Sequence, residues 1–321
     1  MIASTELATA TGPGPERERF LSDVLEGLSR PQKDLPCKWL YDERGSALFE
    51  QICDLPEYYL TRTELAIMER HVRGMAEALG PGCALVEYGS GSSLKTQLLL
   101  GHLRSPAAYL PVDISPDALA GAAERLGRRF PGLPIVPVCA DFTAPLELPV
   151  VPGARRRAVY FPGSTIGNFH KLDAVSFLSR IRAECGRGGA LLLGADLLKD
   201  RKTLLAAYDD ARGVTAAFDL NLLVRANREL GADFRLEAWE HEARFNDRYG
   251  RIEMHLVSRA AQRVTVGGRT FAFRQGETIF TESSYKYGLP ELQALAAIAG
   301  FHTEACWSDP RAWFAVLLLV A

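Results

Sequence analysis

The chain lacks the cysteine patterns that indicate a disulfide scaffold or a metal site. Its six cysteines are scattered over 321 residues, with no C-x-x-C pair and no histidine at metal-ligand spacing. We therefore expect buried apolar thiols, a reduced compartment and no bound metal. Long apolar runs are also missing, because the longest, Trp313–Ala321, is far shorter than the roughly 20 residues that cross a bilayer. With no secretory pattern in residues 1–19, these absences predict a cytoplasmic protein without a membrane partner.

An excess of charge of either sign is absent as well. Lysine and arginine total 37 against 39 aspartate and glutamate, so the net charge is −2 and no broad positive field attracts nucleic acid. Hydrophobic residues make up 47% of the chain, which is typical of a globular protein with a buried core. We expect a monomer that acts on a small molecule.

Short apolar runs alternate with helical patterns through the middle of the chain, as in β-α-β units. This alternation predicts a doubly wound α/β sheet. The expected strands lie at 84–88, 107–112, 134–139, 158–161 and 190–193, and the expected helices at 93–103, 116–130 and 171–185.

The pattern changes after Leu198. Helical stretches at about 202–210 and 214–230 precede hairpin-like strands around 236–245, 252–258, 264–266 and 270–273, which indicates an α+β insertion. The end of the chain returns to a helix at 289–299 and strands at 302–307 and 313–320. We predict a discontinuous first domain, residues 1–198 and 287–321, around an inserted substrate-binding domain, residues 199–286. Residues 61–79 are a further candidate to pack with the insert.

A glycine-rich turn follows the first strand, in the sequence Glu87-Tyr88-Gly89-Ser90-Gly91. Glycines there let the backbone pass close to a ligand just before a helix. A dinucleotide fingerprint and a phosphate-binding P-loop, the latter aligned on Lys95 and Thr96, both require a glycine where Leu94 stands. A nucleotide hydrolase therefore remains only as an alternative.

The third candidate ligand is S-adenosylmethionine, which carries no phosphate. It predicts an acidic residue for the ribose after the second strand and a polar residue for the adenine after the third. Asp113 and the pair Asp141-Phe142 stand at these positions. The alternative, an ordinary tight turn with Asp113 as a helix cap, stays open at this point.

The loop after the fourth strand, Tyr160–Asn168, contains two glycines and an amide side chain at the sheet edge where ligands bind. Carbonyl and amide acceptors can hold the N–H bonds of an amine so that its lone pair faces a methyl donor. Asn168 could equally cap the helix that begins near Lys171.

Several motifs together resemble the histidine Nα-methyltransferases of ergothioneine biosynthesis, from about Pro31 to the end of the chain. The similar segments are Lys38–Asp42, Leu55–Tyr59, Thr61–Glu64, Gly89–Gly91, Gly163–Asn168, Ala207–Asp210 and Thr281–Lys286. The resemblance implies a Rossmann-like methyltransferase sheet with an inserted α+β domain. It also implies transfer of three methyl groups from S-adenosylmethionine to the α-amine of L-histidine, giving hercynine. A related amino acid as substrate, or a sensor that binds without turnover, remains an alternative.

The resemblance also implies a role for each matching residue. The cofactor positions are Tyr41, Phe49, Gly89, Lys95, Asp113, Asp141 and Phe142. The amino-acid positions are Tyr58, Gly163, Asn168, Tyr208, Met254, Glu282 and Ser284, and Asn168, Gly163 and Tyr41 are the implied catalytic residues. In this scheme Asn168 and Tyr208 bind the carboxylate, Glu282 and Ser284 the imidazole, and Met254 forms an apolar wall.

Overall fold

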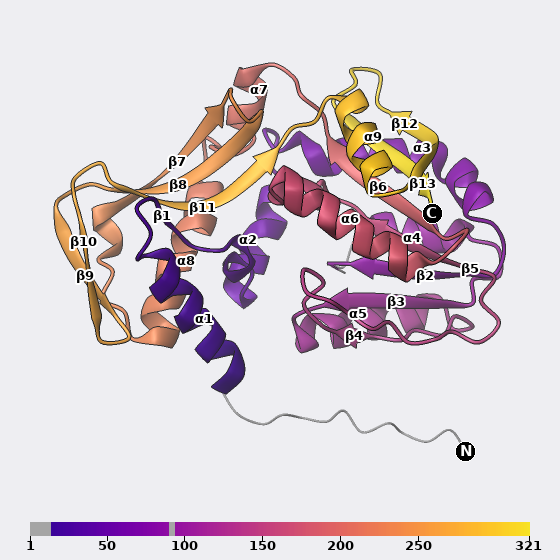
Figure 1. Ribbon diagram of the computed structural model, residues 1–321, viewed down its shortest axis with the longest axis horizontal. Coiled ribbons are helices and arrows are strands. Elements are labelled where there is room, and N and C mark those ends of the chain that lie inside the picture. Colours follow the sequence, from indigo (N-terminus) through magenta and orange to yellow (C-terminus); the bar gives the residue numbers. More distant parts are fainter. Residues whose placement is uncertain (1–13, 90–93) are drawn as a thin grey trace. The chain divides into compact units, whose positions relative to one another are not determined.

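The computed structural model describes residues 14–89 and 94–321, which divide into two compact units (Figure 1). The larger unit comprises residues 55–207, 245–252 and 283–321, and its centre is a seven-stranded sheet. The strand order is β12 (His302–Ser308), β13 (Phe314–Val320), β6 (Ala190–Asp196), β5 (Arg156–Phe161), β2 (Cys83–Tyr88), β3 (Ala108–Asp113) and β4 (Val138–Cys139). Neighbouring strands are parallel except that β13 is antiparallel to both β6 and β12. The predicted doubly wound α/β fold is confirmed.

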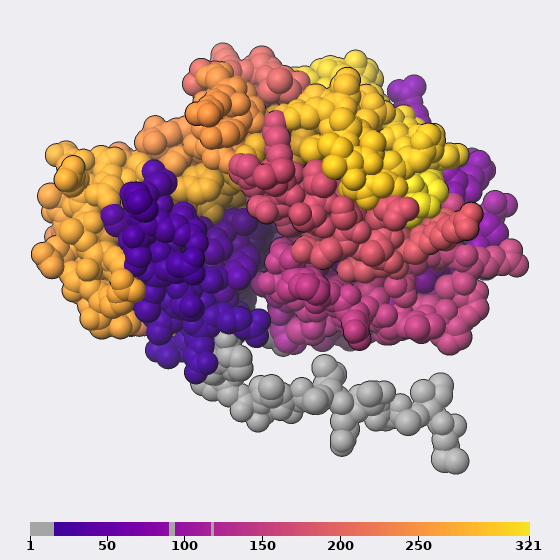
Figure 2. Space-filling model, viewed as in Figure 1, coloured from indigo at the N-terminus to yellow at the C-terminus, as the bar shows by residue number. Residues whose placement is uncertain are grey.

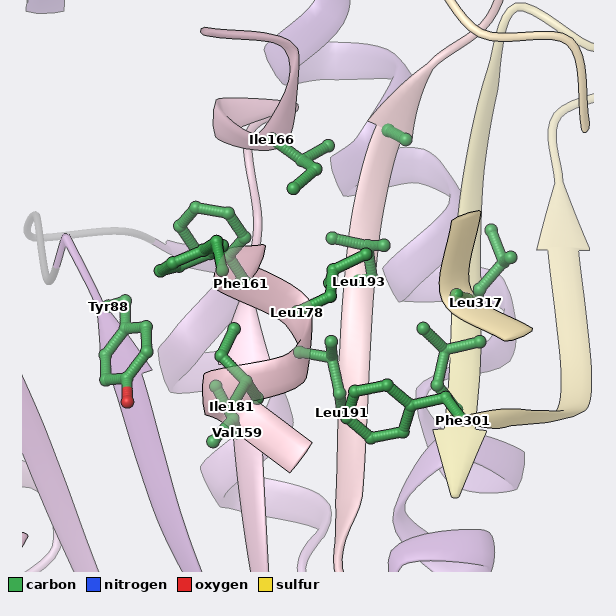
Figure 3. Packing of buried hydrophobic residues seen from close by; sticks show 14 of the residues in the cluster. Tyr88, Val159, Phe161, Ile166, Leu178, Ile181, Leu191, Leu193, Phe301 and Leu317 are labelled. Carbon is green, nitrogen blue, oxygen red and sulfur yellow. The ribbon is translucent and has the colours of Figure 1, made fainter. Parts of the chain in front are cut away.

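Helices cover both faces of this sheet, which explains why β2 and β6 are continuously buried rather than alternating. Helices α6 (Lys171–Cys185) and α9 (Leu289–Ile298) lie side by side on one face (Figures 1 and 2). Figure 3 shows Val159, Leu191 and Leu193 of the strands packed with Leu178 and Ile181 of α6. Helices α3 (Tyr59–Leu79) and α4 (Leu94–His102) pack together, and α5 (Pro116–Arg129) packs on β3 and β4.

Strand β4 is shorter than the predicted strand 134–139. Only Val138 and Cys139 pair with β3, besides an isolated bridge between Tyr109 and Ile135. Pro137 interrupts the ladder because proline has no N–H to donate. The sheet therefore ends in a short edge strand.

The smaller unit comprises residues 14–54, 208–244 and 253–282 of the described chain. Its sheet has the order β1 (Lys33–Asp34), β11 (Thr278–Tyr285), β8 (Arg251–Ser258) and β7 (Trp239–Asn246). The same unit contains a separate two-stranded hairpin of β9 (Gln262–Val266) and β10 (Arg269–Phe273). Its helices are α1 (Gly14–Gly27), α2 (Glu43–Cys53) and α8 (Val214–Leu230), whereas α7 (Arg201–Ala206), just before α8 in the chain, belongs to the larger unit.

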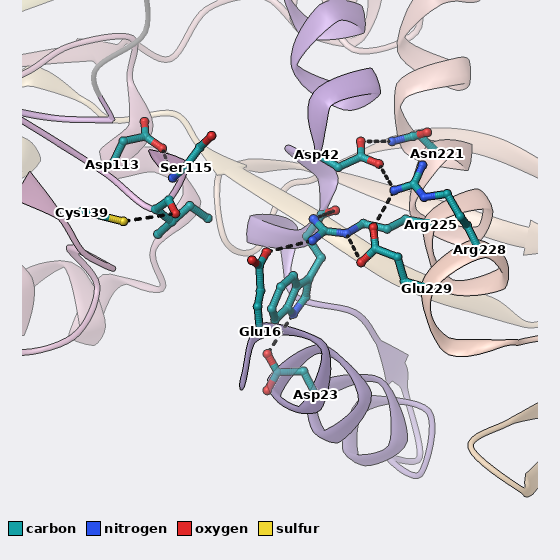
Figure 4. A network of polar contacts seen from close by, with 12 residues as sticks. Glu16, Asp23, Asp42, Asp113, Ser115, Cys139, Asn221, Arg225, Arg228 and Glu229 are labelled. Carbon is teal, nitrogen blue, oxygen red and sulfur yellow. Dashed lines mark hydrogen bonds and ion pairs between the residues drawn. The ribbon is translucent and has the colours of Figure 1, made fainter. Parts of the chain in front are cut away.

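This division differs from the predicted boundaries at several places, and residues 199–207, 245–252 and 283–286 of the predicted insert belong to the larger unit. Residues 14–54, predicted to belong with the sheet domain, cluster with the insert because β1 pairs with β11 and because polar side chains tie α2 to α8. Figure 4 shows Asp42, the N-cap of α2, accepting hydrogen bonds from Asn221 and Arg228, each at 2.7 Å. Residues 61–79, the further candidate to pack with the insert, belong to the larger unit, where α3 packs against α4, β6 and β13.

No helix within residues 14–89 and 94–321 combines the length and the apolarity needed to cross a membrane.

Candidate functional site

Four of the predicted cofactor residues meet at the carboxyl edge of the large sheet. Gly89 follows β2, and its N–H donates to the carbonyl of Val112 at 2.9 Å, next to Asp113. A Cβ atom on Gly89 would lie 3.8 Å from the ring of Phe142, so the glycine backbone passes close to that ring. The φ angle of Gly89 is +72°, which favours glycine. Ser90 and Gly91 of the predicted turn lie outside the described residues.

Asp113 and Asp141 each bind a backbone N–H of the turn that follows them. Asp113 accepts from Ser115 at 3.0 Å, as Figure 4 shows, and Asp141 accepts from Thr143 at 2.8 Å. Burial raises the pKa of the Asp113 carboxyl above its ordinary value, although the hydrogen bond from Ser115 opposes this. Helix α5 begins at Pro116, so Asp113 stabilises the turn before that helix and is not its N-cap, and the alternative that Asp113 is a helix cap is wrong.

Lys95 forms an ion pair with Glu64, a residue for which the sequence analysis assigned no role. Glu64 is fully buried in α3, and its carboxylate also accepts from the N–H of Gly163 at 3.0 and 3.2 Å. One buried carboxylate thus joins a predicted cofactor residue to a predicted catalytic residue. A signal was present in the sequence, because Glu64 lies on the apolar stripe of α3 with Leu60, Ile67 and Met68.

A second buried carboxylate, Glu87, lies at the end of β2. It accepts from the hydroxyls of Thr96, at 2.6 Å, and Tyr109. Burial raises the pKa of Glu87 from 4.5 to about 7, and the two hydrogen bonds offset only part of that effect. Because these partners are protein groups, the structure gives Glu87 a role in holding β2, β3 and α4 together.

We expect Glu87→Gln to change how stability depends on pH. A carboxyl whose pKa is higher in the folded state stabilises the fold below pH 4.5, and that contribution is lost as pH rises through about 7. Relative to the glutamine variant, the wild type should lose on the order of 3 kcal/mol of unfolding free energy across this window. Urea unfolding at several pH values measures this, with the exposed Glu69→Gln as control. Parallel pH profiles for wild type and Glu87→Gln would contradict the assignment.

The loop between β5 and α6 places Asn168 at the end of a 3-10 turn, η2 (Thr165–Asn168). The N-cap of α6 is His170, so the alternative that Asn168 caps this helix is wrong. Ser164 holds a left-handed φ of +61°, and its hydroxyl accepts the N–H of Asp196 at 2.9 Å. This hydrogen bond ties the loop to the end of β6 at the edge of the sheet.

Gly167 brings this loop against β11. A Cβ atom at Gly167 would lie 2.9 Å from the carbonyl oxygen of Tyr285 and 3.4 Å from the hydroxyl of Ser284. The predicted amino-acid residues Asn168 and Ser284 are therefore held close in the larger unit by the absence of a side chain between them. Tyr287 adds a hydrogen bond from its hydroxyl to the carbonyl of Ile166 at 3.3 Å.

We expect Gly167→Ala to displace η2 from β11 and to lower the unfolding free energy by about 1–3 kcal/mol. The KM for histidine should rise because Asn168 moves with the turn. The control is Gly74→Ala in α3, where a Cβ meets nothing within 4 Å and where alanine should stabilise the helix by about 0.5–1 kcal/mol. Thermal unfolding and steady-state kinetics compare the two, and an unaltered Gly167→Ala enzyme would contradict this account of the loop.

In the smaller unit, the predicted cofactor residues Tyr41 and Phe49 form an aromatic group with Phe218 of α8. The ring centroids of Tyr41 lie 5.5 Å from Phe49 and 5.4 Å from Phe218. Phe218 was missed by the sequence analysis, because an aromatic residue on a buried helix face has no distinguishing pattern. Burial, and then the charge of Glu282, raise the pKa of the Tyr41 phenol well above its ordinary value. Tyr41 is therefore a neutral hydrogen-bond donor.

The amino-acid residues Tyr208, Met254 and Glu282 also belong to this unit, and all three are buried. The carbonyl of Tyr208 lies 2.8 Å from Nε2 of His241, whose Nδ1 lies 2.7 Å from Asp219. Although burial opposes it, the hydrogen bond with Asp219 raises the pKa of His241. The carbonyl of Met254 accepts from Thr281, the neighbour of Glu282, at 3.1 Å.

The structure thus gathers the predicted site residues into two sets. The larger unit contains Tyr58, Gly89, Lys95, Asp113, Asp141, Phe142, Gly163, Asn168 and Ser284, and the smaller unit contains Tyr41, Phe49, Tyr208, Met254 and Glu282. The division between the two units falls inside β11, between Glu282 and Ser283, so the strand begins in the smaller unit and ends in the larger one. Among the described residues, no group of three or more histidine, cysteine, aspartate or glutamate side chains could hold a metal.

A family model described as histidine-specific methyltransferase, SAM-dependent, matches residues 20–321. The chain belongs to this family. It is 43% identical to a histidine N-alpha-methyltransferase from Mycolicibacterium smegmatis, over 94% of this chain and 95% of that protein. It is 42% identical to a histidine N-alpha-methyltransferase from Mycobacterium tuberculosis, over 92% and 93%. Ergothioneine biosynthesis protein 1 of Neurospora crassa is 31% identical, over 90% of this chain and 34% of that protein.

The residues at the sheet edge fit the cofactor of this methyltransferase family. The exposed backbone of Gly89 allows a ligand to approach closely. The carboxyl of Asp113 is an acceptor for hydroxyl groups, and the ring of Phe142 provides an apolar face. Phe142 is itself fixed by stacking on Tyr88, with ring centroids 5.5 Å apart and an angle of 4° between the planes. A preformed aromatic wall of this kind suits an adenine ring.

Proposed function

We propose that this chain transfers three methyl groups from S-adenosylmethionine to the α-amine of L-histidine, producing Nα,Nα,Nα-trimethyl-L-histidine (hercynine) in ergothioneine biosynthesis. The observation that carries the proposal is the match to histidine N-alpha-methyltransferases along almost the whole of both chains. Polar residues in each unit support it, because such groups suit an amino acid with a polar ring: the half-buried Asn168 and the buried Ser284 in the larger unit, and the buried Tyr208 and Glu282 in the smaller unit.

The loop around Gly163 is suited to hold the amine. The N–H of Gly163 is committed to Glu64, and the carbonyls of Pro162 and Ser164 accept bonds from Thr165 and Gly167. No described residue donates to the carbonyl of Gly163. We therefore assign the Gly163 carbonyl, together with the Asn168 amide, to accept N–H bonds of the amine and to aim its lone pair.

The amino-acid residues act without a formal positive charge next to the nitrogen that becomes quaternary. The N–H groups of the Asn168 amide and the Tyr208 hydroxyl are neutral donors for the carboxylate, the Asn168 amide oxygen remains to accept from the amine, and the Tyr41 phenol stays protonated. S-adenosylmethionine supplies the electrophilic methyl group. The protein contributes mainly position and a preorganised polar environment, with no covalent enzyme intermediate.

Competition among the standard amino acids tests the proposal. The enzyme is incubated with isotope-labelled S-adenosylmethionine and an equimolar mixture of amino acids, and the products are read by mass spectrometry. We expect a product from histidine alone, with three labelled methyl groups in place of hydrogens. A product from another amino acid would replace histidine as the substrate, and the absence of any methylated product would favour a binding protein or a nucleotide hydrolase. Calorimetry with S-adenosylhomocysteine and with ATP separates those last two.

We further propose that the protein works as a cytoplasmic monomer and requires no metal. Light scattering at assay concentration tests whether the protein is a monomer. Full activity in the presence of a chelator tests whether it works without a metal.

A further inference from the structure

The buried carboxylate of Glu64 lies in a space that a glycine leaves open. Glu64 comes from α3, and β6, which α3 packs against, has a glycine at position 194. A Cβ atom added at Gly194 would overlap Oε1 of Glu64 and would lie 3.2 Å from its carboxyl carbon. Any side chain at position 194 would therefore displace the carboxylate, so the strand helps to define where Glu64 lies.

Two donors from different parts of the larger unit hold this carboxylate. The ammonium of Lys95 pairs with Oε2, and the N–H of Gly163 donates to both oxygens, at 3.0 and 3.2 Å. Glu64 is completely shielded from solvent, and a carboxylate buried to this extent needs such partners because an unpaired charge is too costly. The position of the Gly163 peptide is thus tied to a buried charge.

The backbone is held on both sides of the Gly163 carbonyl. Before this carbonyl, the N–H of Gly163 is bound to Glu64. After it, the Ser164 hydroxyl accepts from the N–H of Asp196 at 2.9 Å, and the Ser164 carbonyl accepts from the N–H of Gly167 at 2.8 Å. Gly163 and Ser164 both have positive φ angles, +75° and +61°, and the second is unfavourable for serine without such support. The direction of the Gly163 carbonyl therefore depends on Glu64.

We propose that Glu64 is a positioning residue that orients the Gly163 carbonyl toward the substrate amine and so promotes the first methyl transfer more than the third. This inference rests on the proposed function, in which that carbonyl accepts an N–H of the amine. A primary amine has two N–H bonds, and a carbonyl that accepts one of them aims the lone pair at the methyl group. A tertiary amine has no N–H, so the carbonyl has nothing to accept.

The chemistry of the three transfers explains why the effect is confined to the early steps. In each transfer the nitrogen lone pair forms the N–CH3 bond while the bond from that carbon to sulfur breaks and its electrons pass to sulfur. The first and second transfers give an ammonium that releases one proton to water before the next transfer. The third transfer starts from Nα,Nα-dimethyl-L-histidine, which has no N–H, and gives the quaternary product.

The measured quantity is the ratio of kcat/KM for Nα,Nα-dimethyl-L-histidine to kcat/KM for L-histidine. With L-histidine this parameter reports the steps up to the first irreversible methyl transfer, so later transfers do not enter it. A change that weakens cofactor binding or the fold lowers both values and cancels in the ratio. A lost positioning role lowers only the value for L-histidine, and the ratio rises.

Two double variants form a matched pair for this test. Glu64→Gln/Lys95→Met and Glu64→Leu/Lys95→Met both remove the ion pair, so neither leaves a buried charge without its partner. Only glutamine can still accept the N–H of Gly163. We expect the ratio in the leucine variant to be about five- to tenfold higher than in the glutamine variant, the effect of one lost hydrogen bond. Affinity for S-adenosylhomocysteine should be the same in both, because they share the change at Lys95.

Equal ratios in the two double variants would overturn the proposal. A ratio raised to the same extent in both, relative to the wild type, would also overturn it, because the effect would then come from the ion pair and not from the hydrogen bond to Gly163.

Should the leucine variant fail to fold, Gly194→Ala takes its place, because it keeps both charges and displaces the carboxylate. Its ratio should also rise above that of the wild type. The control is Gly101→Ala in α4, where a Cβ atom meets nothing within 4 Å and where the ratio should not change. A Gly194→Ala ratio equal to that of the control would overturn the proposal.

These outcomes are distinct from failure of the proposed function. A wild-type enzyme that does not methylate histidine removes the proposed function itself. An enzyme that methylates histidine, but whose ratio does not respond to the loss of the acceptor at position 64, removes only the positioning role of Glu64.

Discussion

Replacing Glu64 with glutamine is expected to lower the free energy of unfolding by about 3–5 kcal/mol. Glu64 is fully buried and pairs with Lys95, which is almost as deeply buried. Glutamine keeps an acceptor for the N–H of Gly163 but leaves the ammonium of Lys95 without its counter-charge. Urea unfolding measures the loss.

The double variant Glu64→Gln/Lys95→Met is the matched test of this explanation. It removes the buried ammonium together with the carboxylate, so it should recover a large part of the lost stability. If the double variant is no more stable than Glu64→Gln, the loss comes from the changed packing of α3 and not from the ion pair. A Glu64→Gln enzyme as stable as the wild type would mean that Lys95 is satisfied without this partner.

Glu282→Ala is expected to lower kcat/KM for histidine roughly 30- to 150-fold. The reason is the loss of a charge-assisted hydrogen bond to the ring, worth on the order of 2–3 kcal/mol. Glu282 is buried on β11, and its charge already acts on the Tyr41 phenol within the smaller unit. Steady-state kinetics with histidine as the varied substrate gives the magnitude.

Ser283→Ala is the matched control for this prediction, because strand alternation directs residue 283 to the opposite face of β11. Its effect should be small. S-adenosylhomocysteine affinity should stay close to wild type in both variants, since neither residue is among the cofactor positions. If histidine turnover survives Glu282→Ala, the carboxylate does not contact the substrate ring, and histidine selection has to come from another group.

Several features of this protein followed from the sequence alone, because they depend on local patterns. The predicted helices 171–185 and 214–230 agree with the bounds of α6 and α8, where apolar residues repeat at helical spacing. The predicted strands 84–88 and 190–193 lie within or next to the largely apolar, continuously buried β2 and β6. The three strand ends that carry Gly89, Asp113 and Asp141 were likewise predictable from their order along the chain, because parallel strands end at the same edge.

Other features were decided only by the tertiary structure. That residues 14–54 belong with the insert follows from the pairing of β1 with β11, in which Lys33 lies opposite Ile279, far away in the sequence. The same holds for the buried pairs of Glu64 with Lys95 and of Asp196 with Lys286. Local periodicity shows that a charged residue lies on a buried face, but it cannot show which opposite charge neutralises it. That choice depends on which strand ends and helix faces meet in the folded chain, since burial makes an unpaired charge too costly to remain.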